Sequence, residues 1–287
     1  MKTRTTIEAL SSSHKIKYRD TIIALGSCFA SEVGGLLKDH DIDCQVNPYG
    51  IVYNPASLAL QMQQLVAKGP LNSDHFVRRD GLQAHLDYHS KLISIDTDSY
   101  QKKLDEINAN FLRSVKKAKT VLLTLGTGYA FEYIKTQKII ANCHKVPGQE
   151  FRRKLLSIEE IITSLNLFID TMLIMNPDLH FICTVSPIRH IRDTLTGNAR
   201  SKAHLLVSVH NLIDRNPNCE YFPSYEIMMD DLRDYRYYKD DFIHPTSKAL
   251  GYIWDTFCDT YMDQVTIAKM KENTRLRKQE GHRPNLD

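Results

Sequence analysis

The sequence lacks any long hydrophobic run. Its longest apolar stretches have only the length of a β-strand, which argues against a membrane-spanning helix of about 20 residues. The beginning of the chain contains no apolar stretch of the kind that a secretory signal peptide needs. We therefore expect no membrane partner and a cytoplasmic location.

The sequence also lacks a large excess of one sign of charge. The 287 residues carry a net charge of +3, with 37 Lys and Arg against 34 Asp and Glu. Non-specific binding of nucleic acid needs a concentrated basic face, so we expect no nucleic-acid partner. A small-molecule or carbohydrate substrate is the expected partner, and the sequence leaves the oligomeric state open.

Paired cysteines are missing as well. The six cysteines form no Cys-x-x-Cys pair, so the sequence predicts neither a zinc cluster nor a disulfide framework. They are Cys28, Cys44, Cys143, Cys183, Cys219 and Cys258. We expect reduced thiols, and a chain of this length with 42% hydrophobic residues can bury a core without disulfide bonds.

Short apolar runs alternate with helical patterns along the chain. The runs lie at 21–25, 120–125, 181–185 and 221–222, and the second and third are typical of strands buried on both faces. Helices are predicted at 31–39, 97–117, 196–214 and 246–261, and after the start signals Asn54-Pro55 and Ser157-x-x-Glu160. This alternation predicts an α/β fold with a parallel sheet covered on both sides.

Three segments fall outside this alternation. Residues 70–96 and 131–141 have the pattern of small inserted hairpins. The tail is charged and has no apolar period from residue 269 onward, which predicts an extended or disordered segment. We divide the chain into one α/β domain, 1–265, and a charged C-terminal tail, 266–287.

Polar residues follow each predicted strand, at the sheet edge where open parallel sheets bind their ligands. The loops are Gly26-Ser27-Cys28, Gly126-Thr127-Gly128-Tyr129, Ser186-Pro187-Ile188-Arg189-His190 and Asp240-Asp241-Phe242-Ile243-His244-Pro245. The first loop has neither the G-x-G-x-x-G pattern of a dinucleotide site nor the P-loop pattern. A phosphate cradle at this loop is therefore not favoured.

A catalytic interpretation of the first loop has more support. Ser27 or Cys28 would lie between a strand end and a helix N-terminus, where free N–H groups can stabilise an oxyanion and lower the pKa of a thiol. Asp241-x-x-His244 supplies a base and the acid that orients it. Together these residues predict nucleophilic acyl chemistry.

The sequence resembles the GSCFA family along nearly its whole length. The resemblance is carried by GSCFA (26–30), NPYGIVYNP (47–55), LGTGYAFEY (125–133), ANCHKVPGQEF (141–151), TVSPIRHIRD (184–193), NARSKAHLL (198–206) and DDFIHPTSKALGYIW (240–254). That family is similar to SGNH, or GDSL-like, hydrolases. The resemblance implies a flavodoxin-like three-layer α/β/α fold and acyl hydrolysis or transfer, often on carbohydrates.

The resemblance also implies roles for single residues. Aligned at the strand end, Cys28 takes the place of the usual nucleophilic serine, whereas a shift of one position would give that role to Ser27. His244 and Asp241 match the D-x-x-H block. The oxyanion donors would be the N–H groups of Gly50, of Gly126 and of the nucleophile elbow itself. Asn142 would replace the asparagine of the third block, whose place holds Gly128.

Further residues are candidates for substrate contact. They are Asn54, His89, Thr127, His144, Arg189, His190 and Lys202. Arg189, His190 and Lys202 could form a basic pocket for an anionic substrate, or a solvated helix start. His85 and His89 have the spacing of metal ligands and could form a site with His144, but no acidic third ligand is clearly placed, so we predict no metal.

Three functions are compatible with these residues. The first is an SGNH-like hydrolase of an acyl ester, such as a deacetylase or esterase, without a cofactor. The second is an acyltransferase with an acyl-coenzyme A donor, which a thiol nucleophile and the basic residues would favour. The third is a non-catalytic carbohydrate- or metabolite-binding protein, which the missing third-block asparagine would favour.

Overall fold

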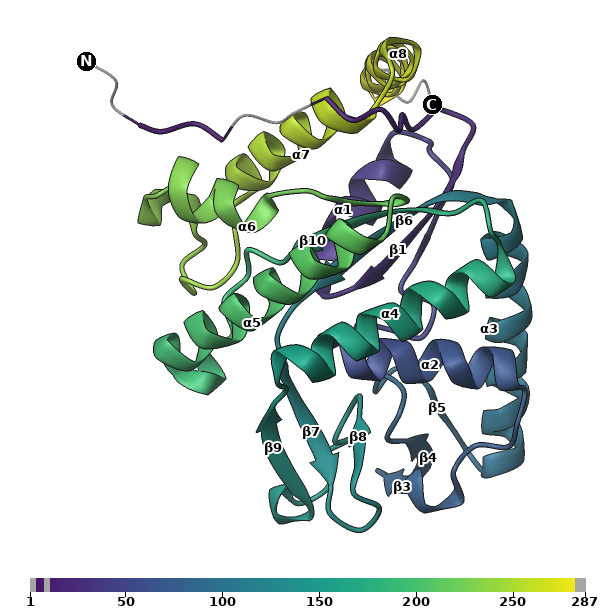
Figure 1. Ribbon diagram of the computed structural model, residues 1–287. Coiled ribbons are helices and arrows are strands. Elements are labelled where there is room, and N and C mark those ends of the chain that lie inside the picture. The colour runs from purple at the N-terminus through teal and green to yellow at the C-terminus, as the bar shows by residue number, and fades with distance from the viewer. Residues whose placement is uncertain (1–3, 8–10, 282–287) are drawn as a thin grey trace, which may run out of the picture.

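The computed structural model describes residues 4–7 and 11–281. Its central sheet has five parallel strands: β1 (Thr21–Gly26), β2 (Cys44–Val46), β6 (Ala118–Leu125), β10 (His180–Val185) and β11 (Cys219–Tyr221). Their order is β11-β10-β6-β1-β2 (Figure 1). Numbered along the chain, this is the 2-1-3-4-5 order of flavodoxin-like folds, which confirms the predicted fold class.

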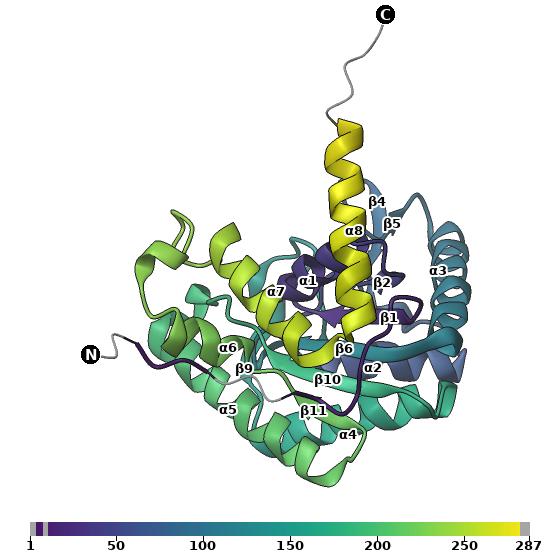
Figure 2. The same ribbon diagram turned by 90° about the horizontal axis from the view of Figure 1, so that it is seen from above.

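Helices cover both faces of this sheet (Figures 1 and 2). One layer contains α1 (Cys28–Asp39), α7 (Ser247–Tyr261) and α8 (Gln264–Gly281). The other contains α2 (Pro55–Ala67), α3 (Thr97–Lys117), α4 (Ile158–Met175) and α5 (Thr194–Arg215). Each layer closes its own hydrophobic core against the sheet, so the fold has three layers.

The two predicted inserts are three-stranded antiparallel sheets below α2 in Figure 1. The first contains β3 (Phe76–Arg79), β4 (Leu82–His85) and β5 (Ile93–Ser94), and the second β7 (Tyr129–Tyr133), β8 (Lys138–Ile140) and β9 (Phe151–Leu155). Each predicted hairpin gains a third strand. Neither β5, with two residues, nor the charged β9 has the apolar alternation that marks a strand.

Short helical turns fill the remaining connections. They are η1 (Ser73–His75), η2 (Gly148–Glu150), η3 (Ile191–Asp193), η5 (Tyr235–Tyr237) and α6 (Ser224–Glu226), which continues into a π-helical turn, η4 (Ile227–Asp231). The edge strand β2 was not predicted, because its three residues are too few to show a period.

The prediction of an irregular tail is wrong for residues 269–281, which belong to α8 (Gln264–Gly281). Only the start of α8 packs on the core, through the buried Thr266 and Met270. Farther along, Asn273 Nδ2 donates to Tyr18 Oη at 2.7 Å, and Arg277 pairs with Asp41. Polar contacts therefore hold this part of α8, which has no apolar stripe in its sequence. Residues 282–287 of the predicted tail lie outside the described part.

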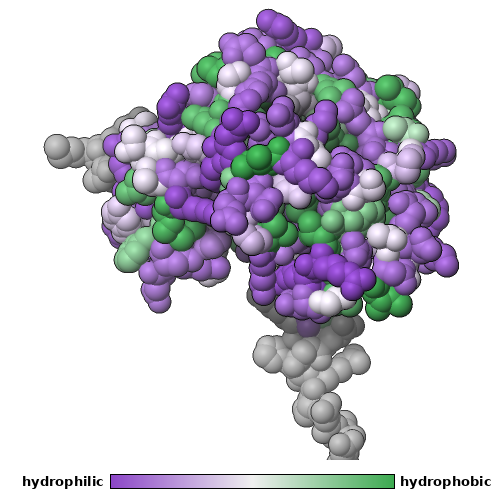
Figure 3. Space-filling view, turned by 90° about the horizontal axis from the view of Figure 1, so that it is seen from below, coloured by the Kyte–Doolittle hydropathy of each residue, from purple (hydrophilic) through white to green (hydrophobic). Residues whose placement is uncertain are grey.

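The surface agrees with the charged composition. The face seen from below is mostly hydrophilic, with separate hydrophobic patches (Figure 3). No helix in the described residues is both long and apolar enough to span a bilayer. All six cysteines are free thiols, as the sequence predicted.

Candidate active site

The chain turns sharply from β1 into α1. Gly26 ends β1 with φ +123°, and a Cβ at this position would lie 2.0 Å from the carbonyl oxygen of Thr124 on β6, so only glycine fits. Ser27 N–H donates to the same oxygen at 3.0 Å. The helix begins at Cys28, three residues before the predicted start, which places Cys28 in its first turn.

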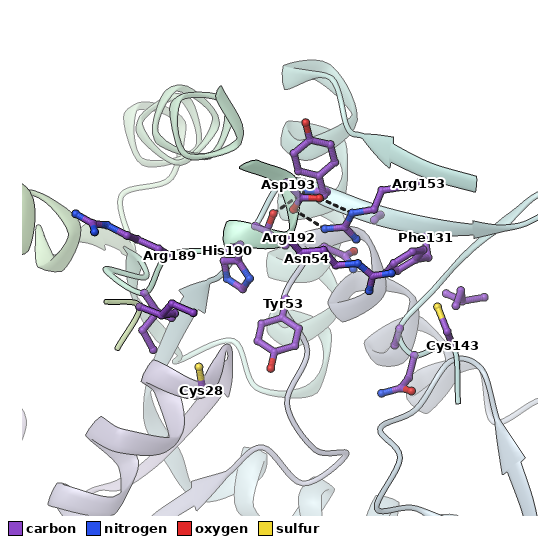
Figure 4. Close-up of a pocket in the computed structure, with 18 of the residues that line it drawn as sticks. Cys28, Tyr53, Asn54, Phe131, Cys143, Arg153, Arg189, His190, Arg192 and Asp193 are labelled. Carbon is purple, nitrogen blue, oxygen red and sulfur yellow. Dashed lines mark hydrogen bonds and ion pairs between the residues drawn. The ribbon is translucent and has the colours of Figure 1, made fainter. Parts of the chain in front are cut away.

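Ser27 and Cys28 lie in different surroundings. The Ser27 side chain is fully buried, and its Oγ has no hydrogen-bond partner in the described residues. Cys28 is half-buried and lines a cavity of about 460 Å³. In Figure 4 its Sγ points from the start of α1 toward this cavity. Of the two candidate nucleophiles, Cys28 is the one that faces the cavity.

The thiol of Cys28 is held mainly in its protonated form. Burial raises its pKa above the usual value, although the N–H groups of Cys28 and Phe29 and the charge of Lys202 act in the opposite direction. The helix N-terminus thus acts in the predicted direction, but desolvation outweighs it, so the expected net lowering of this pKa is wrong. A base must take the proton if this thiol is to attack.

The predicted His–Asp pair is present. His244 Nδ1 lies 2.7 Å from Asp241 Oδ2, while Asp241 Oδ1 accepts the N–H groups of Ile243 and His244 at 2.9 and 3.0 Å. These hydrogen bonds lower the pKa of Asp241, led by the one from the His244 backbone. The carboxylate therefore accepts from Nδ1–H, which leaves the lone pair of His244 on Nε2. His244 lines the same cavity as Cys28.

A second imidazole, His190, also lines the cavity. Its Nε2 is buried without a hydrogen-bond partner in the described part of the chain, and its ring meets the Tyr53 ring edge-on at 5.3 Å. Burial and then the Lys202 charge lower its pKa to about 4, so the ring is neutral at pH 7. Within the described residues no hydrogen bond joins the Cys28 thiol to either imidazole.

Lys202 is not a substrate contact. Its side chain is completely buried, and Nζ donates to the carbonyl oxygens of Gly126 at 2.7 Å and Ser186 at 2.6 Å. It therefore ties together the loops that follow β6 and β10. Desolvation lowers its pKa to about 7, and its charge lies close enough to affect Cys28.

Two predicted oxyanion donors are already engaged. Gly50 N–H donates to Asn47 O at 2.8 Å, and Gly126 N–H donates to Tyr53 O at 2.9 Å. Neither N–H is free for a substrate, so neither glycine fits that role. At the start of α1, by contrast, Ser27 provides no side-chain cap, and Ala30 N–H donates to Ser27 O at 2.9 Å. The N–H groups of Cys28 and Phe29 are then the ones left without an oxygen acceptor in the described residues.

Two asparagine amides line the cavity. Asn54 caps α2 as predicted, with Oδ1 accepting Ser57 N–H at 2.8 Å. Asn142 Oδ1 accepts His144 N–H at 2.9 Å. In both residues the amide oxygen is engaged, while Nδ2 donates no hydrogen bond within the described residues. Either amide nitrogen can donate to a ligand.

The other predicted contact residues lie in two different hollows. Thr127 and His144 line the cavity. His144 Nε2 lies 2.9 and 3.0 Å from the carbonyl oxygens of His85 and Tyr88, so Nε2 donates and the buried Nδ1 keeps an unpartnered lone pair. His89 instead packs on Gly50 in a separate hollow. It does not share the Cys28 cavity.

Sequence reasoning missed Tyr53, Phe131, Arg153 and Arg192 as lining residues. Arg153 and Arg192 lie 4.5 and 5.0 Å from the Phe131 ring centre. Arg153 comes from β9, and Arg192 from the turn before α5. Strands of an insert and a distant turn meet here, and a single sequence carries no signal for that contact.

One group in the described residues has the side chains to hold a metal ion: His75, His85 and Asp87. The sequence had considered His85 with His89 and had not included His75. His75 Nδ1 lies 2.9 Å from Asp87 Oδ1, and His85 Nε2 lies 3.1 Å from the carbonyl oxygen of Asn72. Hydrogen bonds within the protein thus already account for the positions of these groups.

Several solved structures are similar to this chain. A carbohydrate esterase of family 3 from Talaromyces cellulolyticus shares 11% identity with a TM-score of 0.42, covering 88% of this chain and 99% of the other. A family 2 carbohydrate esterase with a carbohydrate binding domain, from Corynascus thermopiles (Myceliophthora fergusii), shares 13% identity with a TM-score of 0.43. The match covers 91% of this chain and 69% of the other. A family 3 carbohydrate esterase from Clostridium thermocellum shares 11% identity with a TM-score of 0.38, and the match covers 88% of this chain and 98% of the other. Values this low do not bear on the activity of this chain.

No curated protein matches the chain in sequence. A protein-family model does match it: the GSCFA family model aligns with residues 21–257, which contain β1, the Cys28 turn and the Asp241–His244 pair. The resemblance found in the sequence is thereby confirmed, and the chain belongs to the GSCFA family.

Proposed function

We propose that this protein hydrolyses acyl esters with the Cys28 thiol as nucleophile. One observation carries the proposal: Cys28, at the uncapped start of α1, and His244, held by Asp241, line one cavity. The resemblance to SGNH hydrolases points to the same chemistry and suggests a carbohydrate ester as substrate.

The proposed reaction has two halves. In the first, Cys28 Sγ attacks the acyl carbon while His244 Nε2 takes the thiol proton. The C–O bond then breaks, His244 returns the proton to the leaving alcohol, and the acyl group remains on Cys28 as a thioester. In the second half, His244 takes a proton from water, the resulting hydroxide displaces Sγ, and the free acid and the thiol are restored.

Hydrogen-bond donors support the negative oxygen that forms in each half. The N–H groups of the first turn of α1 are suited to this task, because Ser27 does not cap them and the helix dipole favours negative charge there. Asn54 or Asn142 supplies a side-chain donor from the cavity wall. Asp241 fixes the tautomer of His244 and stabilises its charged form.

The test is hydrolysis of 4-nitrophenyl acetate by the purified protein and by two variants with substitutions at adjacent positions. Cys28→Ala removes the proposed nucleophile and should lower kcat by a factor of about 10³ or more. Ser27→Ala removes a buried hydroxyl outside the cavity and should leave kcat within about threefold. Equal activity of Cys28→Ala and the wild type would overturn the proposal, as would loss of activity in Ser27→Ala alone.

A second candidate is acyl transfer from a coenzyme A thioester. It is favoured by the cationic side chains of the cavity, Arg192 among them, which suit the phosphates of such a donor. Release of free coenzyme A from acetyl-coenzyme A, dependent on an added sugar acceptor, would identify a transferase. If neither donor nor ester is consumed, the protein is a binding protein on this fold.

A further inference from the structure

The cavity beside Cys28 is strongly cationic. Four positively charged side chains line it, Lys145, Arg153, Arg189 and Arg192, and one carboxylate, Asp193. The charged lining residues together carry +3, which equals the net charge of the whole chain. Such concentration in one hollow creates a local potential that attracts anions.

Two of these cations are engaged by the protein. Arg153 donates from Nε and Nη2 to the two carboxylate oxygens of Asp193, each at 2.6 Å (Figure 4). Arg189 points away from the cavity in Figure 4. Its guanidinium carbon lies 4.0 Å from the Tyr238 ring centre, and Nη1 donates to Phe242 O at 3.3 Å. Arg153 thus has a carboxylate partner, whereas Arg189 has none in the described residues and is held by a ring and a carbonyl oxygen.

Arg192 and Lys145 differ from both in that neither side chain donates a hydrogen bond in the described residues. In the described residues neither has a carboxylate oxygen within 4.0 Å, although both line the cavity. Arg192 is held over the Phe131 ring at 5.0 Å, the same ring that Arg153 approaches at 4.5 Å. Two guanidinium groups thus share one ring, but only Arg153 has a counter-charge. The positive charge of Arg192 is positioned in advance and left uncompensated.

We infer that the cavity binds esters whose alcohol part carries an oxyanion group, a phosphate or a carboxylate, held by Arg192 and Lys145 while the acyl carbon lies at Cys28. This inference rests on the proposed hydrolysis. The guanidinium fork of Arg192 matches two oxygens of either group. Cys28 and Arg192 lie on different sides of Tyr53 in Figure 4, and the cavity of about 460 Å³ suits a ligand that spans both.

The experiment compares three esters that differ only in the group at C6 of the sugar: monoacetylated glucose 6-phosphate, monoacetylated glucuronate and monoacetylated glucose. The wild type should cleave at least one anionic ester with a kcat/KM about tenfold or more above the neutral ester. Arg192→Gln should remove about tenfold of that preference, mainly by raising KM. Salt should raise KM for the anionic ester more than for the neutral one.

Arg215→Gln is the matched control. Arg215 ends α5, the helix that begins beside the cavity, so it lies about 30 Å of helix away, and it is exposed. This variant loses the same charge and should keep the preference. Equal loss in both variants would mean that overall charge, rather than Arg192, sets the preference, and the inference would fall.

The two anionic esters identify the oxyanion group that the cavity prefers. Equal kcat/KM for all three esters overturns the inference and leaves the proposed hydrolysis standing. If no ester is cleaved, the proposed hydrolysis fails, and calorimetric titration with glucose 6-phosphate then tests the anion site separately. Binding that Arg192→Gln weakens about tenfold, and Arg215→Gln does not, supports the site; absence of binding overturns it.

Discussion

Two helices of this protein begin after a serine, and the two serines do different things. Ser157 precedes α4 in a complete capping box: its Oγ accepts Glu160 N–H at 3.2 Å, and Glu160 Oε2 accepts Ser157 N–H at 2.8 Å. Ser27 precedes α1 and caps nothing with its side chain. In α1 the equivalent N–H, that of Ala30, donates to the carbonyl oxygen of Ser27 at 2.9 Å instead. The same residue type at the same helix position therefore closes one N-terminus with its side chain and leaves the Cys28 and Phe29 N–H groups of the other open.

The difference follows from what lies in front of each helix. The start of α4 needs no ligand, so its own side chains satisfy the first N–H groups. The start of α1 faces the cavity that Cys28 lines, where unfilled N–H groups can meet a developing negative charge. We therefore propose that the open N-terminus of α1 serves the reaction, whereas the capped N-terminus of α4 only stabilises its helix.

The largest expected effect comes from removing the proposed base, His244, which lines the same cavity as Cys28 at the start of α1. His244→Ala should lower kcat for 4-nitrophenyl acetate by a factor of about 10² to 10⁴, because no other histidine of the cavity is hydrogen-bonded to a carboxylate in the described residues. His190→Ala, a histidine of the same cavity, is the control and should cost less than about tenfold. A larger loss in His190→Ala would reverse the assignment of the base.

The second effect is on the reactivity of the thiol at α1. Because burial raises the pKa of Cys28, its thiolate forms only as the pH rises through and beyond the usual range of a thiol. Alkylation of Cys28 by iodoacetamide, followed by peptide mass analysis, should therefore accelerate about tenfold per pH unit between about pH 7 and 9. A rate that levels off below about pH 8 would show that the helix start dominates over burial.

The smallest effect compares the two serines directly. Ser157→Ala removes a cap and should lower the free energy of unfolding by about 1 kcal/mol. Ser27→Ala removes a hydroxyl that makes no hydrogen bond in the described structure, so the change should stay within about 0.5 kcal/mol. Urea denaturation measures both, and an equal loss in the two variants would show that Ser27 also caps its helix.

Local signals in the sequence were sufficient for most of the fold. The bounds of α3, the Asn54-Pro55 start of α2 and the capping box of α4 were read from residues a few positions apart. The Asp241–His244 pair was found for the same reason, since one loop carries both residues. Helix caps and loop pairs are short-range, and a single chain records them.

Long-range features were not accessible in this way. Lys202 was expected to meet substrate, yet it is buried between two carbonyl oxygens that lie 76 and 16 residues away in sequence. Arg192 meets Phe131 only because the second small sheet packs against the turn before α5. The pKa of Cys28 depends on burial by the whole fold, which no local pattern reports.

The central claim is that the Cys28 thiol carries the acyl group. Rapid acid quenching of a reaction with 4-nitrophenyl acetate, followed by peptide mass analysis, locates any acetyl group on the chain. We predict an acetyl thioester on Cys28 that hydroxylamine removes, that Ser27→Ala retains and that Cys28→Ala lacks. An acetyl ester on Ser27, or continued turnover by Cys28→Ala, would contradict the account.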